Sequence, residues 1–346
     1  MSIAVIIPVY NSASMLSATL HALRSSTRAP DELWVVDDAS EDDSGAVAKA
    51  LGANVLHLEQ NIGPAACRNR GVLCTSSSIV AFFDADTQVH PDTLERLEAH
   101  FANEPNLAAV IGAYDDTPQE SDPISQYRNL AHCYIHQSSR SDALTFWTGC
   151  GAVRRDAFVH VEGFDERYRR PSVEDIEFGY RLTDQGFRIR LDPCIMVKHA
   201  KRWTLCTALV TDLWDRGIPW MALLLQRGSV PNDLNIGMRH RVSTAMTGFA
   251  CLLVALAEES GLWLVASFAL IVLAISLHAR LFRFVVRGRL ALYPVAWALF
   301  LLSELCNLVA IPGGALLWLL SLNRSQRCSC IRVNVLPETE SEAVSG

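Results

Sequence analysis

The run Ile79–Phe83 constrains the fold more than any other part of the sequence. It is a short apolar run that ends directly in Asp84-Ala85-Asp86. Five apolar residues with β-branched and aromatic members are typical of a strand buried on both faces. The two carboxylates, spaced two residues apart, point to the same side of the strand end. They suit a divalent cation that carries substrate phosphates. A plain strand-end turn is the alternative, since Asp is also common in turns.

Apolar strands and polar helices alternate roughly every 25 residues over the first part of the chain, which predicts an α/β fold with a mostly parallel sheet and helices on both faces. The expected strands are residues 4–9, 33–36, 54–58, 79–83 and 107–112. In such a sheet the strands end at one edge, where ligands bind. Tyr10-Asn11, Asp37-Asp38 and Asp84-Ala-Asp86 should therefore meet in one cleft.

Composition excludes several classes of protein. The 346 residues suffice for one large or two modest domains, and a net charge of −7 argues against nucleic acid as a partner. No G-x-G-x-x-G follows the first strand and no G-x-x-x-x-G-K-[ST] occurs, so dinucleotide and P-loop sites lose their main support. The ten cysteines lack paired metal spacing, and no signal peptide is recognisable, so we expect reduced thiols in the cytosol.

Several short motifs, in this order and spacing, resemble family 2 glycosyltransferases, which have the GT-A fold and use nucleotide-diphospho sugars. The resemblance covers about the first 200 residues. It is carried by Pro8-Val-Tyr-Asn11, Asp37-Asp38-Ala-Ser40, Asn61-x-Gly63 with Arg68-Asn69, Asp84-Ala-Asp86, Trp147-Thr-Gly149-Cys-Gly151, Gly163-Phe-Asp165-Glu166, and Val173-Glu174-Asp175 with the residues up to Leu182.

The resemblance implies a nucleotide site and a metal site. Tyr10 would stack on the base, and Asp38 would accept a hydrogen bond from a ring N–H. Asp84 would lie near the ribose or the metal, and Asp86 would bind Mg²⁺ or Mn²⁺ between the phosphates, with His199 nearby. The nucleotide-binding set is Pro8, Tyr10, Asn11, Asp38, Arg68 and Asp84, and the metal set is Asp86, Asp84 and His199. Arg68 alone would more often be a solvated helix residue, and a lone histidine is more often structural.

An inverting transfer also needs a base for the acceptor hydroxyl. The resemblance implies Asp175 as that base and Glu174 as the neighbour that positions the acceptor. The opposite assignment stays open, as does a purely structural role, because acids are favoured in the first turn of a helix. Trp147, Gly149 and Gly151 would form a loop over the sugar, or else a tight turn around a buried Trp.

The chain becomes mostly apolar after Arg241. Residues 242–257 and 262–279 predict a membrane-crossing helical hairpin, with Glu258-Glu259 outside. Arg280, Arg283, Arg287 and Arg289 predict a cytosolic loop. Residues 291–322, interrupted by Glu304, Asn307 and Pro312-Gly-Gly314, predict a second hairpin, partly re-entrant, because Arg324, Arg327 and Arg332 follow. Buried core helices are the alternative.

The expected organisation is a GT-A domain (1–204), amphipathic interfacial helices (205–241), transmembrane helices (242–322) and a disordered cytosolic tail (323–346). The catalytic domain should lie on the cytoplasmic face of the cell membrane. The leading hypothesis is an inverting, metal-dependent transferase that moves a sugar from a nucleotide-diphosphate donor to a lipid-linked or glycan acceptor at the bilayer. Two alternatives are a polyprenyl-phosphate glycosyltransferase and a catalytically silent membrane scaffold.

Overall fold

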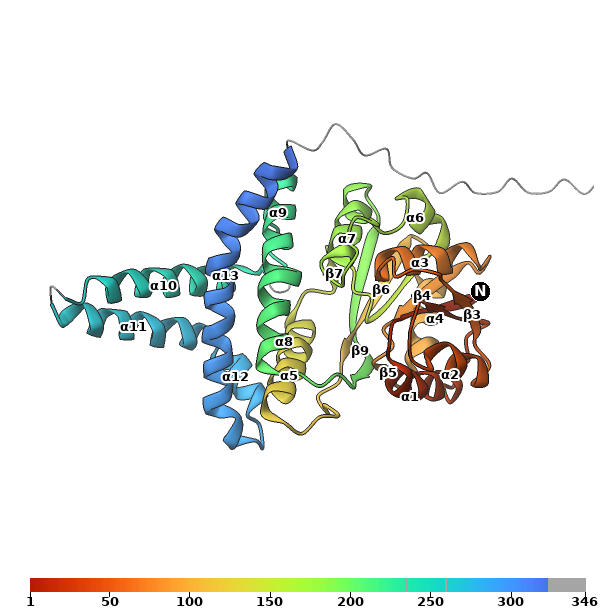
Figure 1. Cartoon of the computed structure of the whole chain (residues 1–346), viewed down its shortest axis with the longest axis horizontal. Helices are drawn as coiled ribbons and strands as arrows, with labels where there is room; N and C mark the ends of the chain where they lie inside the picture. The colour runs from red at the N-terminus through yellow and green to blue at the C-terminus, as the bar shows by residue number, and fades with distance from the viewer. Residues whose placement is uncertain (234–235, 259, 323–346) are drawn as a thin grey trace, which may run out of the picture.

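A computed structural model describes residues 1–233, 236–258 and 260–322. Its centre is one sheet with the strand order β3-β2-β1-β4-β8-β6-β9-β5, in which β7 pairs with β9. Helices lie on both faces of this sheet (Figure 1). The strands are β1 (Ile3–Val9), β2 (Glu32–Asp37), β3 (Asn54–His57), β4 (Ile79–Phe83), β5 (Thr87–Val89), β6 (Leu107–Tyr114), β7 (Asp142–Ala143), β8 (Cys150–Arg154) and β9 (Arg188–His199).

The sheet has a parallel half and a mixed half. Strands β3, β2, β1 and β4 are all parallel, as the alternating pattern predicts. Beyond β4 the sheet is mixed, because β8 enters antiparallel between β4 and β6, and β9 is parallel to β6 but antiparallel to β5. The predicted α/β class with a mostly parallel sheet is therefore confirmed, because β3, β2, β1, β4, β6 and β9 run in one direction and only β8, β5 and β7 run against them.

The first seven helices belong to the sheet. Gly63 precedes α3 with a φ of 90°, a left-handed conformation that glycine adopts without strain, and Pro64 occupies the first turn. This sharp entry brings the start of α3 to the sheet edge where β1 and β4 end. The helices are α1 (Ala13–Arg24), α2 (Ser44–Ala50), α3 (Pro64–Leu73), α4 (Thr93–Asn103), α5 (Pro123–Ser138), α6 (Arg155–His160) and α7 (Glu174–Asp184).

Strand β4 is the centre of the core. All five of its residues are buried, which confirms burial on both faces. The Phe82 ring packs against Phe146, Phe158 and Phe164 at centroid distances of 6.2, 5.8 and 5.2 Å. Because this aromatic cluster fixes the end of β4, the carboxylates that follow start from a rigid base.

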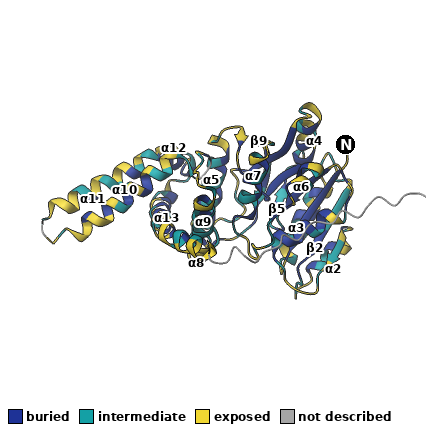
Figure 2. Cartoon of the chain, turned by 90° about the horizontal axis from the view of Figure 1, so that it is seen from above, coloured by how far each residue is buried: buried dark blue, intermediate teal, exposed yellow. Residues whose placement is uncertain are grey.

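The second part of the chain is helical and lies beside the sheet domain (Figure 1). One helical segment runs through α8, the π-helix η1 and α9, and packs against α13. Helices α10 and α11 form a hairpin that projects away from the domain, crosswise to α13 in both views (Figures 1 and 2). The elements are α8 (Leu205–Val210), η1 (Thr211–Gly217), α9 (Ile218–Arg227), α10 (Met238–Ala255), α11 (Leu262–Leu277), α12 (Ala279–Val285), η3 (Leu290–Leu292) and α13 (Tyr293–Leu322).

The predicted second hairpin is wrong, because α13 is one continuous helix of 30 residues with Pro312 inside it. The Pro-Gly-Gly sequence is a packing surface here. A Cβ on Gly314 would lie 2.5 Å from the Cβ of Met221, and one on Gly313 would lie 3.0 Å from the Ile218 side chain. The two glycines therefore let α9 approach closely, and this contact supports the helix at the proline. The arginines after residue 322 and the predicted tail lie outside the described residues.

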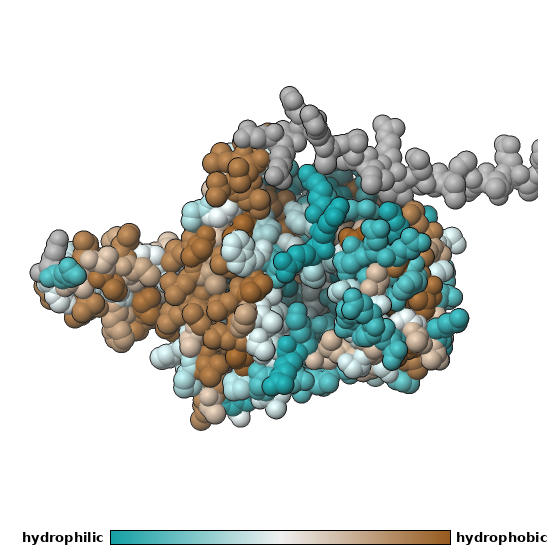
Figure 3. Space-filling model, viewed as in Figure 1, coloured by the Kyte–Doolittle hydropathy of each residue, from teal (hydrophilic) through white to brown (hydrophobic). Residues whose placement is uncertain are grey.

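Apolar side chains cover α13 and the α10–α11 hairpin, whereas the face of the sheet domain beside them is mostly hydrophilic (Figure 3). Phe249, Val265, Phe268 and Leu316 are more than half exposed. Within the described residues, only the helix Leu290–Leu322 is by itself long and apolar enough to cross a membrane, with mean hydropathy 1.9. Helices α11 and α12 pass the same criterion as a pair, bent by 64°.

Candidate active site

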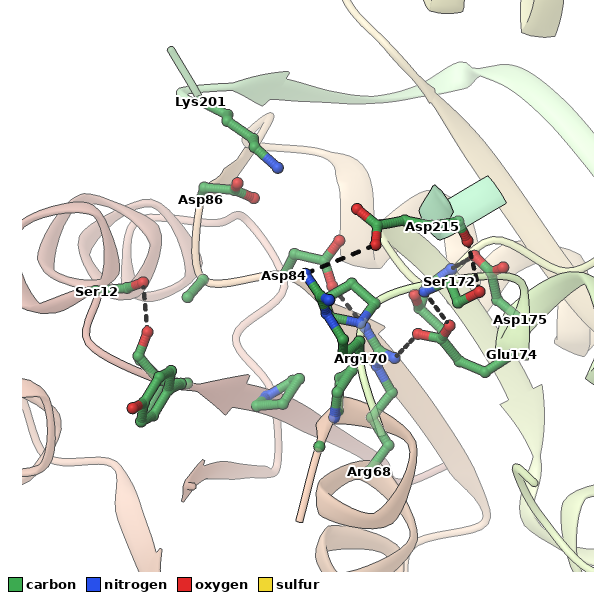
Figure 4. A pocket seen from close by; sticks show the side chains of 18 of the residues that line it. Ser12, Arg68, Asp84, Asp86, Arg170, Ser172, Glu174, Asp175, Lys201 and Asp215 are labelled. Atoms are coloured by element: carbon green, nitrogen blue, oxygen red, sulfur yellow. Dashed lines mark hydrogen bonds and ion pairs between the residues drawn. The ribbon is translucent and has the colours of Figure 1, made fainter. Parts of the chain in front are cut away.

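A cavity of about 560 Å³ lies where β1 and β4 end, between the sheet domain and η1. Asp86 and Lys201 lie on one side of it and Glu174 and Asp175 on the other, with Asp84 between them (Figure 4). The sequence prediction of one shared cleft agrees with this arrangement for Tyr10, Asp38, Asp84 and Asp86, whereas Asn11 and Asp37 do not line the cavity. Pro8, Tyr10, Asp38, Arg68, Trp147 and His199 also line the cavity.

Asp86 and His199 form the outer part of the carboxylate wall. Nε2 of His199 lies 3.5 Å from Oδ2 of Asp86, and Nδ1 lies 2.6 Å from Oδ1 of Asn129. Because an amide oxygen only accepts, Nδ1 carries a proton, and Nε2 is the nitrogen that faces Asp86. Burial opposes ionisation of Asp86, but His199 and Lys201 outweigh it and lower its pKa.

These atoms fit a divalent cation. A histidine nitrogen and a carboxylate oxygen that face each other at 3.5 Å repel unless a cation or a proton lies between them. Asp84, two residues away, supplies a further carboxylate, and burial raises its pKa despite the opposing charge of Arg68. Oxygen and imidazole ligands suit Mn²⁺, and oxygen ligands suit Mg²⁺.

Arg68 connects the two walls of acids. Its guanidinium donates to Oδ1 of Asp84 at 2.8 Å and to Oε1 of Glu174 at 3.0 Å, and the residue is only 3% exposed. The sequence alternative of a solvated helix residue is therefore wrong. Arg68 is placed by the early start of α3, and a buried arginine with two carboxylate partners fixes the distance between β4 and the start of α7.

Glu174 and Asp175 differ in how they are held. Glu174 is buried, bonded to Arg68, and accepts the backbone N–H of Ser172 at 2.8 Å. Asp175 has no cationic partner within 4 Å among the described residues; its contacts are the backbone N–H groups of Ile176 at 2.8 Å and Thr148 at 3.4 Å. Burial, followed by the charge of Glu174, raises the pKa of Asp175 to about 7.

Two of the predicted nucleotide-binding residues make hydrogen bonds that stabilise the local structure. Both carboxylate oxygens of Asp38 accept backbone N–H groups, from Ile62 at 2.7 Å and Gly63 at 2.9 Å. Contact of Asp38 with a base stays a prediction. The Asn11 side chain accepts the N–H of Glu41 at 2.8 Å and does not line the cavity. Tyr10 is 48% exposed at the cavity rim, where a base can stack on it.

The predicted sugar loop enters the cavity through Trp147 and Thr148 only. Gly151 belongs to β8 and pairs with Phe82, and a Cβ there would lie 2.3 Å from the Trp147 carbonyl. A Cβ on Gly149 would meet the Trp147 ring at 2.5 Å. The two glycines thus make room for Trp147, which is 8% exposed, and do not line the cavity themselves.

Sequence reasoning missed a group of residues that line the cavity. Ser172 donates to the carbonyl of Asp215 at 2.5 Å and so joins the loop before α7 to η1. Arg216 follows it in η1 and also lines the cavity. The only sequence signal for these residues in η1 was the presence of charges within a segment expected to be an amphipathic interfacial helix. The missed lining residues include Arg169, Arg170, Ser172, Lys201, Asp215 and Arg216.

A second group of metal-ligand residues lies at the base of the hairpin. Ligand atoms of His240, His278 and Glu304 lie within 4.8 Å of one another. Glu304 accepts the hydroxyls of Ser243, at 2.8 Å, and Thr244, while Nε2 of His278 lies 3.1 Å from the Ser243 hydroxyl. These hydrogen bonds already provide the Glu304 carboxylate with donors. The group therefore connects α10, α13 and the end of α11 through polar contacts.

Known proteins resemble the sheet domain and, in one case, nearly the whole chain. Residues 4–161 match the family model of Glycosyl transferase family 2. The chain is 30% identical over 213 residues to the pre-mycofactocin glycosyltransferase of Mycobacterium tuberculosis, covering 59% of this chain and 43% of that protein. It is 24% identical over 224 residues to the poly-β-1,6-N-acetyl-D-glucosamine synthase of Staphylococcus aureus, covering 61% and 52%. The chain thus spans about half the length of these relatives.

A solved structure extends the likeness to the helical part. The mannosyltransferase PcManGT from Pyrobaculum calidifontis, in complex with GDP-Man and Mn²⁺, aligns over 92% of this chain and 87% of its own, with a TM-score of 0.58 and 17% identity. The two chains therefore share a fold, which confirms the predicted GT-A α/β class followed by an α-helical region.

Proposed function

We propose that this protein is an inverting, metal-dependent glycosyltransferase that moves a sugar from a nucleotide-diphosphate donor to a membrane-associated acceptor. The observation that carries the proposal is that a single cavity has Asp86 and His199 on one side, Asp175 on the other and Asp84 between them. The match to Glycosyl transferase family 2 supports it.

On the donor side, Asp86, Asp84 and His199 would hold the metal, which when bound neutralises the charge on the leaving diphosphate. Lys201 and Arg170 line the same cavity and add positive charge for the phosphates. Tyr10, at the rim, would stack on the base. Asn129 holds His199 in the tautomer that presents Nε2.

On the acceptor side, Asp175 would take the proton of the attacking hydroxyl as the bond from the sugar to the diphosphate breaks. Its raised pKa, about 7, suits a base that works near neutral pH. Glu174 is committed to Arg68, so it would position the site and take no proton. Trp147 lines the same cavity and would help to exclude water from it.

The apolar helices support a bilayer as the third partner. We propose that the α10–α11 hairpin crosses the membrane and that the sheet domain lies on the cytoplasmic face. Helix α10 is about 27 Å long and α11 about 24 Å, close to the thickness of the hydrocarbon core. Arg280, Arg283 and Arg287 follow α11 at the end of the hairpin near the sheet domain, as the positive-inside rule requires.

The direct test of the proposal is release of nucleoside diphosphate from a panel of nucleotide sugars by the purified full chain. Asp86→Ala should abolish metal-dependent donor hydrolysis while the circular dichroism spectrum stays native. Asp43→Ala is the matched control, because Asp43 is exposed and makes no side-chain cap bond. Full turnover by the wild type in EDTA would refute the metal role.

A further inference from the structure

We infer that a second cavity beside the active site binds the acceptor, and that a phosphate group of the acceptor lies against Arg216. This inference rests on the proposed function. The second cavity measures about 220 Å³ and shares four lining residues with the first: Tyr114, His199, Trp203 and Arg216. The two cavities therefore meet at the point where the donor wall and the candidate base face each other.

The two cavities suit different ligands. Sites for drug-sized ligands occupy roughly 300–1,000 Å³, so a nucleotide sugar fits the first cavity, of about 560 Å³, and not the second. Every residue that is predicted to bind the sugar donor and that lines a cavity lines the first cavity. The second cavity, which joins the first through four shared lining residues, is therefore free for the other substrate.

Arg216 is a cation without an anion. Among the described residues, no hydrogen bond or ion pair is formed by its guanidinium. The acids beside it in η1 have other partners. Oδ1 of Asp212 accepts a hydrogen bond from Nη1 of Arg128 at 2.6 Å, and Oδ1 of Asp215 lies 3.9 Å from Nη2 of Arg170. A partly buried guanidinium gains most from a group that accepts two of its N–H bonds, and phosphate has that geometry.

Arg216 also lies within electrostatic reach of the candidate base, because its charge lowers the pKa of Asp175 against the larger effects of burial and of Glu174. A phosphate bound to Arg216 would thus lie beside the reacting end of the acceptor. The position depends on η1, since a π-helical turn changes which side chains of the α8–η1–α9 segment face the sheet domain.

The remaining walls of the second cavity carry apolar side chains beside polar ones such as Arg128, Asp212 and Glu304, and the apolar ones would contact the body of a lipid. Tyr127 comes from α5, Trp220 from α9, Leu281 from α12 and Phe300 from α13. Helix α13 belongs to the layer whose outer surface is apolar (Figure 3). A ligand with its phosphate at Arg216 and its chain between these side chains would reach the surface proposed to face lipid. The phosphate could equally come from a water-soluble acceptor, which the experiment distinguishes.

The test compares binding of farnesyl phosphate, farnesol and glycerol 3-phosphate to the full chain in detergent, measured by calorimetry. Farnesyl phosphate should bind the wild type and Arg202→Ala equally, and Arg216→Ala at least tenfold more weakly; farnesol should bind all three alike. Arg202 is the matched control, because it is exposed and lines neither cavity. Glycerol 3-phosphate binding that depends on Arg216 as strongly would assign the phosphate to a soluble acceptor.

Equal affinity of Arg216→Ala and wild type for both phosphates, or binding of neither phosphate by the wild type, would overturn the inference. Arg216→Gln serves if the alanine variant does not fold. Release of nucleoside diphosphate by the wild type, measured on the same preparation without acceptor, separates this failure from a failure of the proposed function. The inference fails alone if the wild type hydrolyses a donor but binds no phosphate through Arg216.

Discussion

Adjacent acids at the start of α7 have different partners, and this difference predicts different roles for them. Glu174 shares Arg68 with Asp84 in a buried pair, whereas Asp175 has only backbone donors and a raised pKa. Asp175→Asn should therefore lower transfer by roughly 10²-fold or more with donor binding retained. Steady-state transfer and donor calorimetry measure the two effects.

Glu174→Gln is the contrasting variant. It leaves Arg68 with one partner, and removing one member of a buried ion pair costs about 3–5 kcal/mol. We expect a lower Tm for Glu174→Gln and an unchanged or higher Tm for Asp175→Asn. A larger loss of transfer in Glu174→Gln, with native stability, would show that the two roles are reversed.

The pH dependence of transfer follows from the same residue. A base must be deprotonated to accept a proton, and the pKa of Asp175 is raised to about 7. Below that pH the rate should fall about tenfold per unit, and above it the rate should level off. A pH profile of transfer under saturating donor, compared with that of Asp175→Glu, checks this; a rate independent of pH between 5 and 8 would contradict it.

Single residues were predictable where a motif ties chemistry to a strand end or a helix start. Asp84, Asp86 and Asp175 meet in the cavity because β4 and α7 end and begin there. Arg216 lies 41 positions after Asp175, in a segment whose sequence gives only amphipathicity. Its role depends on the contact between η1 and the sheet domain, and no local pattern encodes that contact.

At the scale of elements, the contact between α9 and α13 depends on glycines. Gly314→Ala would bring a Cβ to 2.5 Å from the Cβ of Met221, so one helix must shift, at a cost of about 1–3 kcal/mol in the free energy of unfolding. Thermal unfolding in detergent measures the change. Gly261→Ala is the matched control, because its Cβ would meet no atom within 4 Å, and it should unfold like the wild type.

Elements with regular periodicity were predicted well, and those with mixed signals were not. The parallel strands β1 to β4 were found because continuous apolar runs mark them. Strand β9 contains Arg190, Asp192 and Pro193, and β8 contains Gly151, so neither resembles a buried strand. The sequence around Pro312 suggested a break because the partner helix that supports it is 94 positions away, at Ile218.

At the scale of the whole molecule, the proposed topology is testable by labelling. Cysteines at Glu258 and Arg287, in a background without competing thiols, should respond differently to an impermeant reagent in intact cells. Glu258→Cys, at the exposed tip of the hairpin, should react from outside, and Arg287→Cys only after lysis. Equal protection of both would mean that the hairpin does not cross.

The crosswise arrangement of the hairpin and α13 determines whether the number of membrane crossings is even or odd. Two segments at such an angle cannot both stand upright in one flat bilayer (Figures 1 and 2). If the hairpin is upright, α13, about 45 Å long, lies along the surface, and the described residues up to Leu322 cross the membrane an even number of times. Leu322 then ends on the same side as Met1. The hairpin would anchor the protein in the membrane. Helix α13 would then lie at the membrane surface, where a lipid substrate could pass from the bilayer to the cavity.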